Sequence, residues 1–282
     1  MEPVFRLTLD CPDRVGIVAR VSQFLAQYNG TITEANQHAD LEQGWFFLRN
    51  EIKADSLPFG LATLQEAFAP IAQDLNMRWQ IHDSRIRRKV VLMASKDSHC
   101  LADLLHRWQA GELDCDIPCV IANHDHLRAM VEWYGIPYHY VPAVDKTAHF
   151  TEVERIITEV EADTVVLARY MQILPTEFCA RWSLKIMNIH HSFLPSFVGA
   201  KPYHQAFERG VKLIGATCHY VTSDLDAGPI IDQDVTRVSH RDDIVEMVRR
   251  GKDVERSVLA RGLRWHLEDR VLVHGNKTVV FE

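Results

Sequence analysis

Two kinds of hydrophobic pattern alternate over the first 83 residues of the chain. Short segments rich in β-branched and aromatic residues, bounded by turn residues, predict strands at 5–10, 31–40, 44–52 and 76–82. Apolar residues at helical spacing predict one helix between the first two strands and another over 61–75. The first helix is defined by Val15, Val18, Val21 and Leu25, with Ile17 and Phe24 widening the apolar stripe. The order β-α-β-β-α-β is the ferredoxin-like arrangement.

Both ends of the first predicted helix carry residues that commonly end helices. Asp13 lies in the turn before the helix, where its carboxylate can accept a hydrogen bond from a backbone N–H, so we expect it to be the N-cap. Asn29 and Gly30 follow the last apolar residue, and both tolerate the left-handed backbone that ends many helices. The sequence therefore predicts a helix confined between these two signals.

The remaining two thirds of the chain alternate between strand and helix patterns. The first strand, KVVLMAS, is a continuous apolar run, as expected for a strand buried on both faces. Such alternation predicts a Rossmann-like, doubly wound and mostly parallel sheet. Strands are predicted at 89–95, 115–123, 136–142, 163–170, 183–190 and 213–221, with a further strand after Gly228-Pro229, and helices at 99–113, 125–135 and 149–162. A hairpin is predicted at 270–282.

A polar, basic segment separates the two patterns. Residues 82–89, HDSRIRRK, hold four Lys or Arg residues and little apolar material, which is typical of a linker. We therefore expect one domain over residues 1–84 and a second over 85–282, and the length of 282 residues suits two domains.

Composition limits the class of protein. The net charge of −7 argues against a partner that is a nucleic acid, and no apolar run approaches the roughly 20 residues of a membrane helix. The N-terminus lacks the basic region of a signal peptide, so we expect a cytoplasmic enzyme with no membrane partner. The six Cys residues show no zinc-ligand spacing, and no other metal-ligand cluster appears, so no metal is expected.

Three polar residues indicate where the chemistry occurs. Asn188 and His190 end a predicted strand, and residues two apart on a strand point to the same face. Ligands of doubly wound sheets bind at the carboxyl ends of strands, where Asp226 arrives from the loop after another strand. A His can transfer protons, an Asp can orient it, and an Asn can donate a hydrogen bond to an oxyanion.

The N-terminal segment DCPDRVGIVARVSQFLAQYNGTI resembles an ACT domain, a regulatory module, over about residues 4–83. The resemblance implies a regulatory amino acid such as glycine or methionine, with Asp13, Gly16 and Ile17 as candidate contacts. The alternative is that these residues only shape the turn and begin the helix. ACT domains also pair with one another, which implies a homodimer or homotetramer.

The segment NIHHSFLPSFVGAKPYHQAFERGVKLIGATCHYVTSDLDAGPII resembles the formyltransferase-fold family that uses 10-formyltetrahydrofolate. The resemblance covers about residues 89–282 and assigns catalysis to Asn188, His190 and Asp226. It leaves the roles of His191 and His219 open, although His191 is expected to face away from His190. The resemblance implies a folate substrate and no cofactor. The candidate folate-binding residues are Leu167, Met171, Gln172, Ile173 and Leu174 in LARYMQILP, and Thr222, Ser223, Asp224 and Leu225 in the loop before Asp226.

The acceptor of the formyl group distinguishes the enzymes of this family. Its ribonucleotide formyltransferases cradle a phosphate in a Gly-rich loop after the first strand. The corresponding loop here, ASKDSHCLADLL, has no Gly, and Asp97 would repel an anion although Lys96 could partly compensate. An ACT domain before a formyltransferase domain is the layout of the 10-formyltetrahydrofolate deformylases. This resemblance implies hydrolysis to formate and tetrahydrofolate, which feeds formate to purine synthesis and balances the one-carbon folate pool.

Three alternatives remain open at the level of sequence. One is formyl transfer to an amine such as glycinamide ribonucleotide. Another is a non-catalytic amino-acid sensor, and a third is a protein that stores folate without chemistry. Intact Asn188, His190 and Asp226 argue against the sensor.

Overall fold

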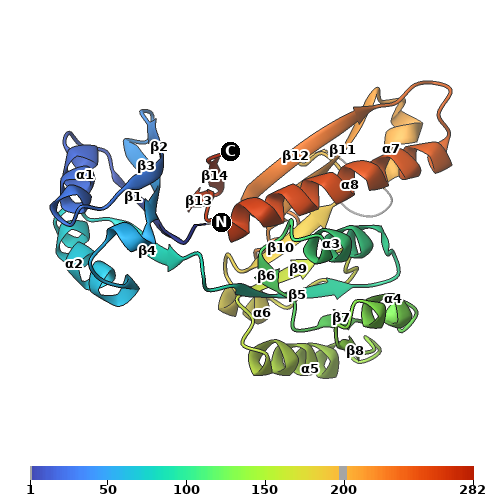
Figure 1. The fold of residues 1–282 in the computed structure, drawn as a ribbon. Coiled ribbons are helices and arrows are strands. Elements are labelled where there is room, and N and C mark those ends of the chain that lie inside the picture. The colour runs from blue at the N-terminus through green and yellow to red at the C-terminus, as the bar shows by residue number, and fades with distance from the viewer. Residues whose placement is uncertain (1, 197–201) are drawn as a thin grey trace. The chain divides into compact units, whose positions relative to one another are not determined.

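The computed structural model describes residues 2–196 and 202–282. Contacts divide the chain into two compact units (Figure 1). The first runs to Arg87 and also contains 268–274 and 278–282, and the second contains 88–267 and 275–277. The sequence placed the whole C-terminal part in the second domain, and the structure corrects that assignment for the terminal hairpin.

The hairpin belongs to the first unit because it covers apolar and charged groups there. Leu272 and Phe281 form a buried cluster with Phe47 of the N-terminal sheet. The fully buried Arg49 donates through Nη2 to the carbonyl oxygen of Glu268 at 2.9 Å. A buried guanidinium needs such acceptors, and nothing in the local pattern of the hairpin could indicate this packing.

The first unit has the predicted β-α-β-β-α-β order. Its antiparallel sheet has the strand order β2-β3-β1-β4. Its core contains the apolar faces of both helices. The elements are β1 (Val4–Pro12), α1 (Ile17–Gln27), β2 (Ile32–Asp40), β3 (Trp45–Lys53), a 3-10 turn (Ala54–Ser56), α2 (Leu61–Asp74) and β4 (Arg78–Asp83).

The start of α1 differs from the prediction. Its N-cap is Gly16, at φ 96°, and no side chain caps the helix, so the N-cap assigned to Asp13 was wrong. The backbone N–H of Asp13 instead donates to the carbonyl of Gly44 at 2.8 Å. Val15 and Val18 are exposed rather than part of the core, because Val15 precedes the helix and Val18 lies on a different side of it from the buried residues. The residues that α1 buries are Ile17, Val21, Phe24 and Leu25.

The end of α1 agrees with the prediction. Asn29 adopts the left-handed backbone, at φ 58°, and the N–H of Gly30 donates to the carbonyl of Leu25 at 2.9 Å. This bond satisfies a carbonyl that the ending helix leaves without an intrahelical partner.

The second unit contains a mixed, mostly parallel sheet with the strand order β12-β11-β10-β9-β5-β7-β8. Pairs β10–β11 and β11–β12 are antiparallel, and the other neighbours on this path are parallel. The predicted strand 115–123 is two shorter strands, since Pro118 between them has no N–H to donate. The strands are β5 (Arg88–Ala94), β6 (Cys115–Asp116, paired with β5), β7 (Val120–Ala122), β8 (Tyr138–Tyr140), β9 (Thr164–Leu167), β10 (Ile186–His190), β11 (Leu213–Tyr220) and β12 (Ile230–Arg237). The predicted terminal hairpin is β13 (Val271–His274) and β14 (Lys277–Val280).

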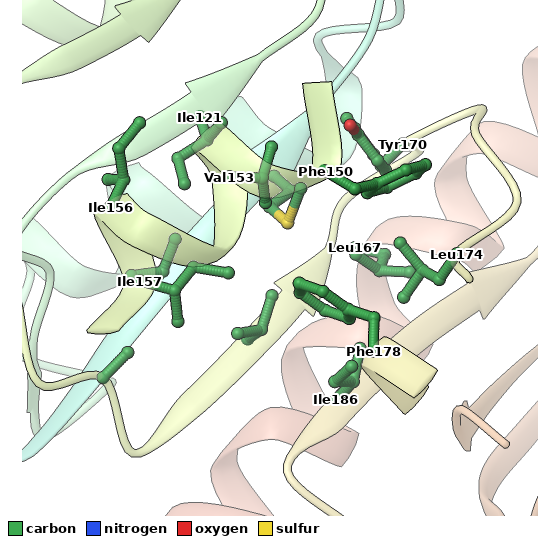
Figure 2. Close-up of a cluster of buried hydrophobic side chains, with 14 of the residues drawn as sticks. Ile121, Phe150, Val153, Ile156, Ile157, Leu167, Tyr170, Leu174, Phe178 and Ile186 are labelled. Atoms are coloured by element: carbon green, nitrogen blue, oxygen red, sulfur yellow. The ribbon is translucent and has the colours of Figure 1, made fainter. Parts of the chain in front are cut away.

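Helices cover both faces of this sheet. On one face α3 packs against the long helix α8, which lies along β10, β11 and β12 (Figure 1). On the other face α5 and α6 bury Phe150 and Phe178 against β9 and β10, as Figure 2 shows. The helices are α3 (His99–Gln109), α4 (Arg128–Trp133), α5 (Lys146–Glu159), α6 (Thr176–Arg181), α7 (Pro202–Arg209) and α8 (Ile244–Leu267). The sequence had predicted α3, α4 and α5 but neither α6, α7 nor α8.

None of the helices in residues 2–196 and 202–282 combines the length and apolar character that a membrane span requires.

Candidate active site

A cavity of about 490 Å³ lies at the carboxyl ends of β9 and β10. All three residues predicted to be catalytic, Asn188, His190 and Asp226, line it. The predicted folate contacts line it as well, namely Leu167, Met171, Gln172, Ile173, Leu174, Thr222, Ser223, Asp224 and Leu225. The sheet therefore brings the two segments of predicted folate contacts and the three polar residues to one place.

Strand register places Asn188 between two pocket residues. In the sheet it pairs with Leu167 of β9 on one side and with His219 of β11 on the other. Its Nδ2 lies 3.2 Å from Nε2 of His219. The role of His219 was open at the level of sequence, and the structure shows that this buried histidine contacts the predicted catalytic group.

The tautomer of His219 determines how the Asn188 amide is oriented. Nδ1 of His219 lies 2.9 Å from the backbone carbonyl of Tyr220, which can only accept, so Nδ1 carries the proton. Burial lowers the pKa of His219 below its ordinary value, which leaves the ring neutral and its Nε2 an acceptor. The Asn188 amide therefore donates one N–H to His219, and its second N–H is available to a ligand.

The side chains of His190 and Asp226 meet at the same place. Nδ1 of His190 lies 3.1 Å from one Asp226 carboxylate oxygen, and the other oxygen lies 3.7 Å from Nε2 of His219. Burial raises the pKa of Asp226, but the hydrogen bond from His190 and the electrostatic interactions with the neighbouring histidine rings outweigh burial and lower the pKa overall. The ionised carboxylate holds the proton of His190 on Nδ1. Nε2 of His190, which has no hydrogen-bond partner among the described residues, is then free to act as a base.

The loop that carries Asp226 depends on a glycine. Asp226 has a positive φ of 54°, and Gly228 follows it at the start of the return to β12. A Cβ on Gly228 would lie 1.8 Å from the carbonyl oxygen of Tyr220. Real Cβ atoms do not approach a backbone oxygen so closely, so this position requires glycine.

His191 lies in the wall of the same cavity, contrary to the expectation that it faces away from His190. The strand ends at His190, so strand alternation no longer determines the direction of the next side chain. Its ring centroid lies 5.2 Å from that of His190 and 6.0 Å from that of Tyr203. Burial, with the nearby charge of Arg169, lowers the pKa of His191 to about 4, so its ring is neutral near pH 7.

The apolar part of the cavity has an anchored floor and an exposed rim. Leu167, Tyr170 and Leu174 belong both to the cavity lining and to the buried cluster in Figure 2. Met171 and Ile173 are instead more than half exposed, although they are apolar. Exposed apolar side chains around a concave site favour a flat apolar ligand.

The sequence did not single out five further residues of the cavity wall, namely Arg169, Tyr170, Cys179, Ile189 and Val221. Arg169 is the most informative of them, with a positive φ of 63° and ion pairs to Asp97 and Glu255. The signal in the sequence was a charged residue two positions after the end of a buried strand, β9. The partners of Arg169 lie far from it in the sequence, so the sequence gave no indication of these ion pairs.

The three candidate contacts for a regulatory amino acid lie together where α1 begins in the first unit. Asp13 and Gly16 are exposed, whereas the side chain of Ile17 is buried in the core. Ile17 can therefore offer a ligand only its backbone.

Among the described residues, His99, Cys100 and Glu255 bring three metal-ligand atoms within 4.8 Å of one another. The Glu255 carboxylate is already engaged, since its oxygens lie 2.7 Å from Nε2 of His99 and 2.6 Å from the hydroxyl of Tyr203. Both oxygens of this carboxylate therefore have hydrogen-bond partners within the protein.

The two units match two known families. Residues 5–55 match the ACT domain, and residues 88–263 match the formyl transferase family. These matches define a formyl transferase domain that follows an ACT domain.

Comparison with whole proteins identifies the family more closely. The chain is 48% identical to the formyltetrahydrofolate deformylase of Synechocystis sp., over 98% of this chain and 97% of that protein. It is also similar to a formyltetrahydrofolate deformylase from Pseudomonas syringae pv. tomato whose crystal structure is known. The two chains are 66% identical, and their structures superpose with a TM-score of 0.98 over 100% of this chain and 95% of that one. Glycinamide ribonucleotide transformylase 1 from Symbiobacterium toebii is more distant, at 25% identity and a TM-score of 0.67, over 70% of this chain and 95% of that one. The chain belongs to the formyltetrahydrofolate deformylase family.

Proposed function

We propose that this protein hydrolyses 10-formyltetrahydrofolate to formate and tetrahydrofolate. The observation that carries the proposal is the convergence of Asn188, His190 and Asp226 in one cavity, with the free Nε2 of His190 and the second N–H of Asn188 both available. Close relatives over nearly the full length are named formyltetrahydrofolate deformylases, which supports water as the acceptor.

The chemistry follows from these atoms. Nε2 of His190 accepts a proton from water while the water oxygen forms a bond to the formyl carbon. The oxygen of the formyl group becomes an oxyanion, to which Asn188 donates a hydrogen bond. The C–N10 bond then breaks as His190 returns the proton to N10. Tetrahydrofolate leaves, and the formic acid made from the formyl group and water loses its proton to become formate. Asp226 stabilises the imidazolium between the two proton transfers.

Two segments would hold the folate. The apolar rim, with Met171 and Ile173 from one segment and Leu225 from the other, suits the flat pterin ring. Backbone groups of the same segments offer hydrogen bonds to its edge. Thr222, Ser223 and Asp224 close the cavity beside the ring.

The measurement that tests the proposal is formate release from 10-formyltetrahydrofolate, with and without glycinamide ribonucleotide. We expect release at the same rate in both cases. Release that requires the amine would instead support the transferase. Tight folate binding without turnover would support a folate-storage protein. If no formate were released under any condition, that result would support a non-catalytic amino-acid sensor.

The same proposal includes no metal and no cofactor, since the reaction needs only proton transfer and oxyanion stabilisation. Activity should therefore survive exhaustive dialysis against a chelator, and a loss that Zn²⁺ or Mg²⁺ restores would contradict this part.

The ACT domain supports regulation by an amino acid, for which glycine and methionine are our candidates. Titrating each against formate release tests this, with Asp13→Ala as the variant expected to weaken the response. We also propose a homodimer or homotetramer, which light scattering of the purified protein would distinguish from a monomer. In the cell, the reaction would supply formate to purine synthesis in the cytoplasm and balance the folate pool.

A further inference from the structure

His191 is a polar residue of the cavity wall to which the mechanism above gives no role. Asn188 pairs with His219, and His190 pairs with Asp226. Neither ring nitrogen of His191, in contrast, forms a hydrogen bond or an ion pair with any residue that the structure describes. The ring is partly buried and lines the cavity together with His190. Polar atoms in such a place usually bond to a ligand or to an ordered water.

The surrounding chain fixes the position of His191. Directly after it, the backbone carbonyl of Ser192 accepts a hydrogen bond from the buried hydroxyl of Thr217 at 2.9 Å. The ring itself meets that of Tyr203 edge to face, with the centroids 6.0 Å apart. The Tyr203 hydroxyl in turn donates to the carboxylate of the buried Glu255 at 2.6 Å. Support of this kind is what a side chain with a role in binding requires.

The protonation state of His191 suits a hydrogen bond with water. Burial is the main cause that lowers its pKa to about 4, so the ring is neutral near pH 7. A neutral imidazole has one nitrogen that donates and one that accepts. His191 can therefore accept a hydrogen bond from a water without removing a proton from it.

The spacing of His190 and His191 fits one water between them. Two hydrogen bonds of about 2.8 Å to the same water, at its tetrahedral angle, join acceptors about 4.5 Å apart. The centroids of the two rings lie 5.2 Å apart and their planes are inclined by 59°. Rings at this separation can present two nitrogens at the distance that a shared water needs.

We propose that His191 is a further catalytic residue, which binds the attacking water together with His190. The water donates one hydrogen to Nε2 of His190, which takes it as a proton, and the other to the accepting nitrogen of His191. A lone pair of the water oxygen then forms the bond to the formyl carbon. The second hydrogen stays on that oxygen and leaves with the formic acid. This inference rests on the proposed function, since it states how the hydrolysis holds its water.

The experiment compares kcat and KM for formate release in the unchanged protein and four variants, together with the Kd for tetrahydrofolate. His191→Phe keeps a ring and removes both nitrogens. His191→Asn and His191→Gln place an accepting oxygen near the positions of Nδ1 and Nε2, so one of them restores an acceptor whichever nitrogen faces the water. His204→Phe is the matched control, because it makes the same change at an exposed histidine of α7.

We expect His191→Phe to lower kcat by about 100-fold, the loss typical of a misplaced reactant. KM and the Kd for tetrahydrofolate should change little, because the water is separate from the folate contacts. The better of His191→Asn and His191→Gln should recover roughly tenfold of the lost kcat, the effect of one hydrogen bond. His204→Phe should match the unchanged protein.

Two kinetic outcomes would overturn the proposal. One is an unchanged kcat in His191→Phe. The other is an equal loss of kcat in all three His191 variants, which would show that the ring has only a packing role. His191→Leu replaces His191→Phe, with the same expected loss, if circular dichroism shows that the first variant does not fold.

A crystallographic arm tests the water without turnover. With tetrahydrofolate bound, the unchanged protein should hold a water about 3 Å from both Nε2 of His190 and a ring nitrogen of His191, and His191→Phe should lose it. A water that contacts His190 alone would contradict the role of His191. Failure of the proposed function is distinguishable, since an unchanged protein that binds this water but releases no formate would contradict only the hydrolysis.

Discussion

Nδ1 of His190 lies 3.1 Å from a carboxylate oxygen of Asp226, so a strand end and a distant loop form one acid–base pair. The hydrogen bond holds the proton on Nδ1 and leaves Nε2 as the base. Asp226→Asn would retain the shape of the side chain but remove the negative charge that stabilises the imidazolium of His190. It would also favour the other tautomer of His190, with the proton on Nε2. We expect formate release to fall by about 10³–10⁴-fold, the effect known for such replacements in catalytic triads.

The measurement is kcat for formate release, with the circular dichroism spectrum as the check on folding. Asp125→Asn, which removes an exposed carboxylate paired with Arg128, is the control and should keep full activity. A folded Asp226→Asn protein with unchanged turnover would remove Asp226 from the mechanism.

Asn188→Ala should reduce kcat by about 100–1000-fold, as expected for loss of one donor to an oxyanion. KM should change little, because the hydrogen bond strengthens only as charge develops. His219→Phe should act in the same direction with a smaller loss, since it removes the group that orients the amide but leaves the amide in place. If His219→Phe were the more damaging of the two, His219 would have a role of its own.

His190→Ala should abolish measurable formate release, because it removes the Nε2 that accepts the proton from water in the proposed mechanism. Folate binding should persist, and fluorescence titration with tetrahydrofolate would check it. Loss of binding together with turnover would show that His190 has a structural role.

Gly228→Ala should strongly lower both stability and activity, since the new Cβ would meet the carbonyl oxygen of Tyr220 at 1.8 Å. The loop would have to move, and Asp226 with it. Gly60→Ala is the matched control, because a Cβ there meets nothing within 4 Å and its φ is −86°. Thermal melts should show a large fall in Tm for Gly228→Ala and only a small one for Gly60→Ala, from the weaker N-cap of α2; similar melting of both would contradict the close approach.

The lowered pKa of His191 predicts a pH-dependent stability. Its ordinary pKa of 6.5 falls to about 4 in the folded protein, so folding disfavours the protonated ring. The stabilisation is fully present above pH 6.5 and is lost as the pH falls toward 4, by roughly 2–3 kcal/mol in the free energy of unfolding. In His191→Asn, urea unfolding between pH 7 and pH 4 should show a smaller loss than in the unchanged protein.

His204→Asn, which removes an exposed histidine of α7, is the control for that series and should follow the unchanged protein. An identical pH dependence of stability in His191→Asn and the unchanged protein would show that His191 is not responsible.

The sequence by itself determined most of the elements and the location of the chemistry. The ferredoxin-like order, the parallel strands β5, β7, β8, β9 and β10, and helices α3, α4 and α5 follow from patterns that are local to each segment. Asn188 and His190 were also predictable, because polar residues at the end of a buried strand mark the ligand edge of such a sheet. The helices α6, α7 and α8 were not predicted, although α8 is the longest of the described helices.

The tertiary structure decided the relationships between distant segments. It placed the terminal hairpin on the first unit, where Arg49 required an acceptor. It also brought His219 next to Asn188 on the neighbouring strand, and it paired Asp97 with Lys252, which lies far from it along the sequence. Hydrogen bonds and ion pairs depend on distances in space, and periodicity along a chain carries no information about them. Local patterns therefore predicted where Asn188 and His190 lie, whereas only the tertiary structure determined which groups form hydrogen bonds and ion pairs with them.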